Sequence, residues 1–330
     1  MDSSTEDIRR LSDWLEPVQE ILLRHGYGRS FVGGSSAREI LDHVLLGKPL
    51  ALRDLDLYLV RGGTVRPRDL RVLCDAVRER GLARVGRRRP KCRANPAFSG
   101  ADCYAYLVGY GAHLFTPGLP ILSLGVLHHP SDLALNGLFD IDAVYLTLDN
   151  EQSLRTYADR VARGGPTTGL VLDPYGGYGA WRRKAPAIVH WAEVERCLVR
   201  NAYRIVRSLA KVRTLHLPDG LREAYLSRGP GAVADDEVPE LHRDFLKVLG
   251  DTHWAEELGM LARLRALAPL WPPLQAELEQ STPQGLRRAI PSPPGAGPHE
   301  LSCLRARALC RDPAILAAVL SVAPLVFGAP

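Results

Sequence analysis

Hydrophobic and polar positions alternate most clearly in the first sixty residues of the chain. Leucine, valine and isoleucine recur at helical spacing over residues 5–26, which predicts an amphipathic helix. An apolar run at 30–34 predicts a strand, helical spacing returns over 36–46, and DLDLYLV at 54–60 alternates as a strand does. Glycines and a proline separate these segments, so the pattern predicts helix, strand, helix and strand in that order.

The pattern changes twice more along the chain. The segment RPRDLRVLCDAVRERG predicts a further helix, and β-rich runs follow at 102–127. After about residue 186 helical spacing dominates. We therefore expect an N-terminal helix (1–27) packing on an α+β head (28–185, a mixed sheet with helices), followed by an α-helical body (186–330).

Composition narrows the class of protein. The chain has 330 residues, 46% of them hydrophobic, and a net charge of +5, which permits a polyanionic partner without requiring one. Its six cysteines include no CxxC pair, which argues against a zinc ribbon. The first residues are acidic and polar, unlike a signal peptide, and no run of 18 apolar residues lacks charge or punctuation. We expect a cytoplasmic protein with reduced thiols and no membrane partner.

Two carboxylates occupy the strand at 54–60. Alternate residues of a strand point to the same side, so Asp54 and Asp56 share one face while Leu55 and Leu57 face a core. Neighbouring carboxylates repel unless a cation lies between them. Magnesium suits such a pair because it prefers hard oxygen ligands and retains water and phosphate oxygens in its shell. The spacing therefore predicts a Mg²⁺ site.

A glycine-serine turn precedes these carboxylates. Gly33 and Gly34 end the predicted strand at 30–34, and Ser35 connects it to the helix at 36–46. Glycine lets the backbone approach a ligand closely, and a helix start offers unpaired N–H groups to an anion. Either feature alone is more often structural. Together, a turn that can bind phosphate and a following strand that can bind a metal predict phosphoryl or nucleotidyl transfer through metal ions.

The segment FVGGSSAREILDHVLLGKPLALRDLDLYL resembles the head of the class II tRNA nucleotidyltransferase/poly(A) polymerase family, whose signature is GGxVRDxLLG followed by DxD. The matched positions are Gly33, Gly34, Arg38, LLGKP at 45–49, and the two aspartates. The resemblance implies a polymerase-β-like nucleotidyltransferase head. It also implies that Asp54 and Asp56 hold Mg²⁺, that Gly33, Gly34 and Ser35 hold the β- and γ-phosphates, and that Arg38 neutralises phosphate.

Three further stretches follow in the family's order. PSDLALNGLFD is similar to RRDFTINAMAY, LVLDPYGG to LIDPFGG, and RNAYRIVRSLAKVRTLHLPDGLREA to the family's base-reading helix. The first and third matches imply nucleotide contacts at five positions, namely Asp132, Asn136, Asn201, Arg204 and Arg207.

This sequence departs from the family in the nucleotide motifs. Pro130 and Ser131 replace the paired arginines before Asp132, and Arg200 and Asn201 replace the acidic pair that opens the base-reading helix. An asparagine offers both a donor and an acceptor to a base, in a pattern unlike that of an acid. We therefore expect a nucleotide preference that differs from ordered C-C-A addition. About thirty residues, from 141 to 169, are inserted between the second and third motifs.

A second pair of aspartates, a basic loop and a group of aromatic residues could each serve the structure rather than the reaction. Asp140 and Asp142 form a second DxD, which we expect to be solvent-facing carboxylates near the site. The basic loop RVGRRRPKCR (84–93) could contact RNA, although such loops are usually only solvated. Three aromatic residues around the DPYGG turn are expected to pack between head and body rather than to stack on a base, namely Tyr175, Tyr178 and Trp181.

Together these features predict a Mg²⁺-dependent nucleotidyltransferase that transfers NMP from an NTP, ATP included, to an RNA 3′ end, with tRNA the leading acceptor. Two alternatives stay open. The same chemistry could serve a small-molecule or protein acceptor, or the chain could be a non-catalytic RNA-binding relative. The intact Asp54 and Asp56 argue against the last.

Overall fold

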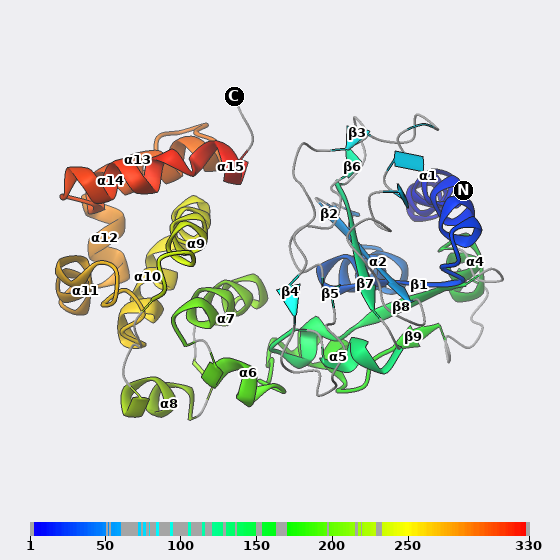
Figure 1. Ribbon diagram of the computed structural model, residues 1–330, viewed down its shortest axis with the longest axis horizontal. Coiled ribbons are helices and arrows are strands. Elements are labelled where there is room, and N and C mark those ends of the chain that lie inside the picture. The colour runs from blue at the N-terminus through cyan, green and yellow to red at the C-terminus, as the bar shows by residue number, and fades with distance from the viewer. Residues whose placement is uncertain are drawn as a thin grey trace. The chain divides into compact units, whose positions relative to one another are not determined.

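The computed structural model divides into two compact units, residues 1–183 and 184–330 (Figure 1). The sequence places the change from head to body two residues later. The structure describes residues 3–50, 52, 54–60, 72–73, 75–76, 79, 84–85, 93–94, 105–106, 114–115, 121–127, 130–135, 137–149, 154–162, 170–196, 198–214, 217–218, 220–228 and 233–327.

The first unit alternates helices and strands. Its elements are α1 (Ser3–Arg24), β1 (Arg29–Gly33), α2 (Gly34–Leu46), β2 (Asp54–Val60), β3 (Arg84–Val85), β4 (Arg93–Ala94), β5 (Ala105–Tyr106), β6 (Leu114–Phe115), β7 (Ile121–Leu127), the 3₁₀ turns η1 (Pro130–Leu135) and η2 (Asp140–Asp142), β8 (Tyr145–Asp149), α4 (Leu154–Ala162), β9 (Val171–Leu172) and α5 (Gly177–Arg183).

A seven-stranded sheet organises this unit in the order β3-β6-β7-β2-β1-β8-β9. Strand β2 pairs parallel with β7, whereas β1 pairs antiparallel with both β2 and β8. The sheet is therefore mixed, and the predicted α+β class is confirmed. Strand β8 and helix α4 come from the inserted residues 141–169, so the insertion completes the sheet rather than forming a separate appendage.

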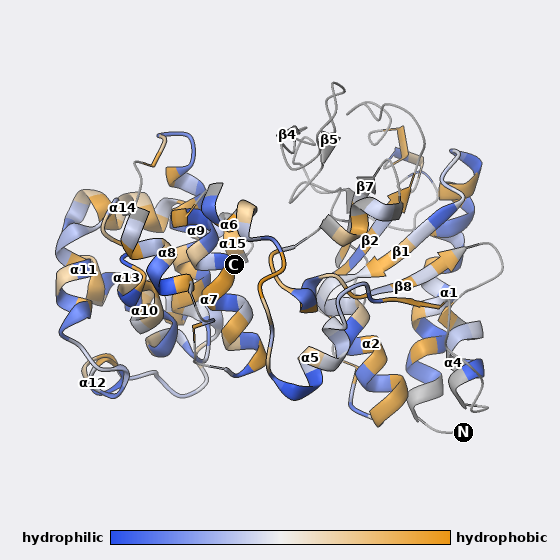
Figure 2. Ribbon diagram, turned by 90° about the horizontal axis from the view of Figure 1, so that it is seen from below, coloured by the Kyte–Doolittle hydropathy of each residue, from blue (hydrophilic) through white to orange (hydrophobic). Residues whose placement is uncertain are grey.

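One face of the sheet is buried under helices. Leu55, Leu57 and Leu59 of β2 are each 0% exposed and join a hydrophobic cluster with residues of α1, α2 and α4. Figure 2 shows these three helices together on one side of β1, β2 and β8. Because side chains alternate along a strand, the residues of β2 that lie between these leucines point to the opposite face of the sheet.

The opposite face has a smaller apolar cluster. Phe31, Leu133, Ala143 and Tyr145 are buried there, and Tyr58 packs against them. Strand β2 therefore presents two aspartates and then a tyrosine on this face, in the burial pattern eBiBiBi. The apolar cluster covers one end of the face and leaves the aspartates outside it.

Every element of the second unit that the structure describes is a helix. They are α6 (Trp191–Arg196), α7 (Leu198–Val212), α8 (Leu221–Arg228), α9 (Val238–Gly250), α10 (Trp254–Arg263), α11 (Pro272–Glu279), α12 (Pro283–Ala289), α13 (Pro298–Leu309), α14 (Pro313–Ser321) and α15 (Ala323–Phe327).

Aromatic side chains form part of the second unit's core. Phe245 of α9 packs on Trp271 at 4.5 Å between ring centroids, and His242 stacks on the same indole at 5.6 Å. Burial lowers the pKa of His242, which favours the neutral imidazole in this apolar setting. Among the described helices of both units, none combines the length and hydrophobicity that crossing a membrane requires.

Candidate active site

The two predicted carboxylates lie at the start of β2. Asp54 is exposed and Asp56 is half-buried, while Leu55 between them is fully buried. The predicted strand, 54–60, has the same bounds in the structure. Both aspartates therefore stand on the face that the covering helices leave open, as the alternation of the sequence predicts.

Gly33 is required where β1 meets this face. It lies opposite Asp56 on one side and opposite Tyr145 on the other. A Cβ at position 33 would meet the rings of Tyr145 and Tyr58 at 2.6 Å. These two rings pack edge to face, with centroids 5.6 Å apart. The glycine thus lets an aromatic pair close against the strand that leads to the site.

Gly34 begins α2 and adjoins the carboxylate of Asp56. Its φ of +63° favours glycine. A Cβ at this position would lie 3.4 Å from Oδ2 of Asp56. The residue therefore keeps the space next to the carboxylate free of a side chain, and it turns the chain from strand into helix.

Ser36 joins α2 to the strand of the aspartates. Its hydroxyl donates to the backbone carbonyl of Asp54 at 3.0 Å and accepts from the backbone N–H of Asp56 at 3.2 Å. The side chain is 0% exposed. Sequence reasoning selected Ser35 and missed Ser36; the available signal was that position 36, not 35, shares the buried stripe of α2 with Ile40.

The N-terminus of α2 lies beside the carboxylate of Asp56. No side chain caps it at Gly33, and its first turn holds no acidic residue. The helix spans 13 residues, so its first N–H groups carry the partial positive charge of the helix dipole. These donors lie beside Asp56, the same carboxylate that Gly34 adjoins. The structure thus brings a helix start, which favours an anion, and the two carboxylates of β2 together.

Arg38 lies in the interior rather than at the surface. It is 3% exposed and donates through Nη1 to the carbonyl of Ile141. The same Nη1 lies 3.9 Å from Asp142, and the guanidinium stacks 4.9 Å above the centre of the Trp181 ring. Burial lowers the pKa of Arg38, and the nearby carboxylates, chiefly Asp142, oppose that shift. These contacts fix η2 and α5 to α2, and neutralisation of phosphate by Arg38 stays a prediction.

Asp42 ties α2 to α5 on the next turn of the helix. Its carboxylate accepts hydrogen bonds from Lys48 at 2.6 Å, Tyr178 at 3.0 Å and Trp181 at 3.2 Å. Burial by itself would raise the pKa of Asp42, but these donors hold it below its ordinary value. Tyr178 and Trp181, predicted to pack between head and body, make these bonds within the first unit.

The DPYGG turn begins α5. Asp173 accepts from the backbone N–H groups of Gly177 at 2.6 Å and Tyr178 at 3.0 Å, as an N-cap does. A Cβ at Gly177 would collide with the carbonyl of Asp140 at 2.0 Å. The hydroxyl of Tyr175 donates to the carbonyl of Ala134 at 3.0 Å. The motif therefore fastens α5 to both 3₁₀ turns.

The second DxD corrects one expectation. Asp140 is 6% exposed and accepts from the N–H of Ile141 at 2.7 Å, so it does not face solvent as predicted. Asp142 accepts from the N–H groups of Leu138 and Phe139, each at 3.4 Å. The reason is local: short polar side chains satisfy the backbone donors of a tight turn. The backbone of Asp132 lies in η1, and Asn136 lies outside the described residues.

The predicted base-reading residues belong to α7 of the second unit. Asn201 is 1% exposed, Arg204 is exposed and Arg207 is half-buried. Arg200, which stands where the resemblance expects an acid, forms an ion pair with Glu240 of α9 at 3.1 Å. Nucleotide contact by Asn201, Arg204 and Arg207 stays a prediction of the resemblance.

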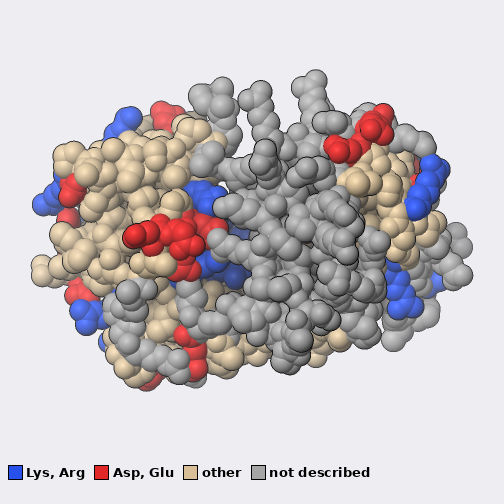
Figure 3. All heavy atoms as spheres, viewed as in Figure 1, with Lys and Arg blue, Asp and Glu red and all other residues tan. Residues whose placement is uncertain are grey.

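Charge on the molecular surface is mixed. In Figure 3, basic and acidic side chains are interspersed over the described part of the second unit that faces the viewer. Residues 86–92 of the predicted basic loop lie outside the described residues. Within the part of the chain that the structure describes, no three His, Cys, Asp or Glu side chains gather to hold a metal ion.

Comparison with solved structures identifies the fold. A structure titled "tRNA-processing enzyme (apo form 2)" matches 93% of this chain and 76% of its own, with a TM-score of 0.53 at 17% identity. "tRNA-processing enzyme (apo form I)" matches 98% and 79%, with a TM-score of 0.52 at 16% identity. The chain has the fold of these tRNA-processing enzymes.

A third structure of this fold, titled "Structure of tRNA-processing enzyme complex 3", matches 95% of this chain and 74% of its own, with a TM-score of 0.53 at 16% identity. No protein-family model and no curated protein matches the sequence. At 16–17% identity, the likeness to these structures is a likeness in fold.

Proposed function

We propose that the chain is a nucleotidyltransferase that transfers NMP from an NTP to an acceptor hydroxyl at an RNA 3′ end. One observation carries the proposal: two carboxylates on the open face of β2 adjoin the uncapped N-terminus of α2, with Gly34 beside the Asp56 carboxylate. A helix start attracts phosphate and paired carboxylates attract a divalent cation. A fold shared with tRNA-processing enzymes supports the same chemistry and the choice of RNA.

The residues at this site fit Mg²⁺. Asp54 and Asp56 offer hard oxygen donors on one face of a strand, and no side chain at position 34 crowds Asp56. When bound, the cation would lower the pKa of the acceptor hydroxyl and stabilise the negative charge that develops on the phosphates. Ser36 would hold the two aspartates in register by fixing the backbone of both.

Residues of the chain itself bind the triphosphate and position the helix that holds it. The first N–H groups of α2 bind the β- and γ-phosphates, and Gly33 and Gly34 allow the backbone to come close. This places the α-phosphate near Asp54 and Asp56. The acceptor hydroxyl gives up its proton to water, its oxygen forms a bond to the α-phosphorus, the bond from that phosphorus to the bridging oxygen breaks, and pyrophosphate leaves with the electron pair. Arg38 and Asp42 act as positioning residues, since their contacts fix α2 to η2 and α5.

The test is incubation of the protein with each α-labelled NTP, Mg²⁺ and total RNA. We expect label in RNA, and we expect Asp54→Asn or Asp56→Asn to reduce incorporation by at least about 100-fold. The matched control is Asp159→Asn, which removes one exposed carboxylate from α4. Thermal unfolding should show that all three variants fold.

Nearly wild-type incorporation by Asp54→Asn would refute the assignment of the site. Label in a small molecule or a protein, with none in RNA, would keep the chemistry and overturn the acceptor. RNA binding without incorporation of any NTP would indicate a non-catalytic relative.

A further inference from the structure

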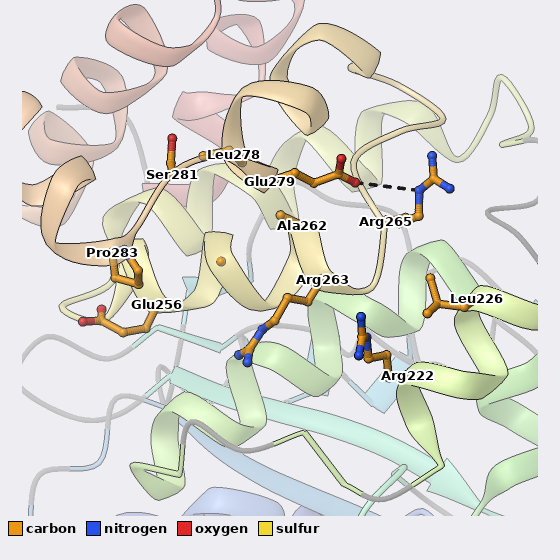
Figure 4. Close-up of a pocket in the computed structure, with 11 residues that line it drawn as sticks. Arg222, Leu226, Glu256, Ala262, Arg263, Arg265, Leu278, Glu279, Ser281 and Pro283 are labelled. Carbon is orange, nitrogen blue, oxygen red and sulfur yellow. Dashed lines mark ion pairs between the residues drawn. The ribbon is translucent and has the colours of Figure 1, made fainter.

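The helical unit contains a cavity of about 780 Å³ that no step of the proposed reaction uses. Residues of α8, α10 and α11, the first residue of α12, and the turns that follow α10 and α11 line it (Figure 4). Three of its lining residues are arginines, Arg222, Arg263 and Arg265, and two are glutamates, Glu256 and Glu279. All lie between residues 222 and 283, so one unit builds the whole cavity.

The two glutamates are already neutralised. Glu279 lies 3.8 Å from Nε of Arg265, across the cavity wall drawn in Figure 4. Glu256 accepts from Nε of Arg287 at 3.2 Å and also from its Nη2. Arg287 lies outside the lining, so it neutralises Glu256 without adding an unpaired positive charge to the cavity. Both glutamates of the lining therefore have a basic partner.

Arg222 and Arg263 are left without a counter-charge. Both side chains are exposed, and within the described residues neither forms an ion pair or a hydrogen bond. Arg222 comes from the first turn of α8 and Arg263 from the last turn of α10. Two unpaired guanidinium groups on one cavity leave it with a local excess of positive charge, although acidic and basic groups are mixed over the unit's surface.

The lining indicates which anion these arginines suit. A guanidinium binds phosphate through two parallel N–H donors, a geometry that phosphate oxygens match. The rest of the described lining is mainly aliphatic, with Leu226, Leu278 and Pro283, and none of these described residues is an aromatic ring on which a base could stack. Such a site binds phosphate without reading the base, which is what contact with a polynucleotide backbone requires.

We propose that this cavity binds phosphodiester groups of RNA through Arg222 and Arg263. The proposal rests on the proposed function only in its choice of RNA as the polyanion. The site makes binding independent of sequence, because phosphate contacts carry no base information.

The experiment measures binding of a labelled single-stranded RNA to the full chain over a series of salt concentrations, with no NTP present. Arg222→Gln/Arg263→Gln is compared with Arg288→Gln/Arg307→Gln, a control that removes the same charge from exposed arginines of the same unit outside the cavity. We expect the first pair to weaken binding at least about tenfold and to reduce the log–log salt slope by about 1.4, since each single-strand phosphate contact contributes about 0.7. The control pair should change both much less.

Equal effects of the two double variants would overturn the proposal, because they would show a general charge effect. A parallel titration with ATP separates a backbone site from a nucleotide site: loss of ATP binding in Arg222→Gln/Arg263→Gln, with RNA binding intact, would also overturn it. Thermal unfolding verifies that both variants fold.

This binding assay can fail independently of the proposed function. Transfer of label to RNA by a protein whose cavity variant binds RNA normally would refute only the cavity. Loss of RNA binding in that variant, with no transfer from any NTP by the wild type, would support the cavity and refute the nucleotidyltransferase.

Discussion

The ring of Tyr145 occupies the position that a side chain at Gly33 would take, 2.6 Å from where its Cβ would lie. Gly33 has an extended backbone, with φ −130° and ψ 178°, so left-handed geometry is not what requires a glycine here. The requirement is space, because Tyr145 and Tyr58 pack edge to face over this point of β1. The aromatic pair and the glycine together close the apolar end of the open sheet face.

Gly33→Ala should therefore destabilise the protein. The added methyl group must displace one of two packed rings, and overpacking of this kind costs about 1–3 kcal/mol. Urea denaturation measures the change. Gly28→Ala is the matched control, because nothing lies within 4 Å of its Cβ position. Equal stability of the two variants would show that the rings move aside freely.

Ser36 and Ser35 should separate in their effects. Ser36→Ala removes a buried hydroxyl that bonds to the backbone of both aspartates, and we expect a loss of about 1–2 kcal/mol in the free energy of unfolding. Ser35→Ala should change it by less than about 0.5 kcal/mol. Chemical denaturation of the two single variants makes the comparison. A larger loss for Ser35→Ala would mean that the hydroxyl at 36 does not hold β2 in place.

Asp42→Asn should destabilise the protein in a pH-dependent way. Three donors hold the pKa of Asp42 below its ordinary value of 3.8, so the carboxylate contributes stability that is present above that value and is lost as the pH falls through the lower, folded pKa. We expect a deficit of about 1–2 kcal/mol at pH 7 that shrinks in strong acid. Unfolding curves across this range test it, and a deficit that does not depend on pH would contradict the ionic account.

Glu257 should produce the opposite pH dependence. Burial raises its pKa to about 9, Asp251 adds to the rise, and Arg207 opposes it. The side chain is 0% exposed. A raised folded pKa means that stability is fully present below the unfolded value of 4.5 and declines as the pH rises toward 9.

Glu257→Gln removes this titration. We expect the variant to gain at least about 1 kcal/mol over the wild type at pH 8, with a smaller difference at pH 5. Denaturation at the two pH values measures it. If the free energy of unfolding changed equally between pH 5 and pH 8 in the wild type and the variant, Glu257 would ionise in the folded protein at little cost.

Two residues of α7 should differ in what they affect. Arg204→Ala changes an exposed side chain and should leave stability within about 0.5 kcal/mol while altering the preference among the four NTPs. Asn201→Ala removes a buried amide and should cost about 1–2 kcal/mol in unfolding free energy. Competition among labelled NTPs and chemical denaturation give the two readouts. An unchanged preference in Arg204→Ala would count against the resemblance at this helix.

The sequence by itself determined the elements that carry the candidate site. Strand β2 follows from a period of two with leucines on one side, and helix α2 from a period near 3.6 that ends at Gly47, which has a φ of +65°. These patterns depend on neighbours in the chain, so they are legible without the fold. The shared face of Asp54 and Asp56 follows from the same local rule.

Only the tertiary structure decided what the other polar groups do. Arg38 is a surface residue by composition, yet it bonds to a carbonyl 103 positions away and lies in the interior. Ser36 bonds to the backbone of β2 and Asp42 to side chains of α5, and Arg222 and Arg263 share a cavity that α8 and α10 both line. Burial and pairing depend on groups that the fold brings together from distant parts of the chain, and no local spacing encodes which groups those are.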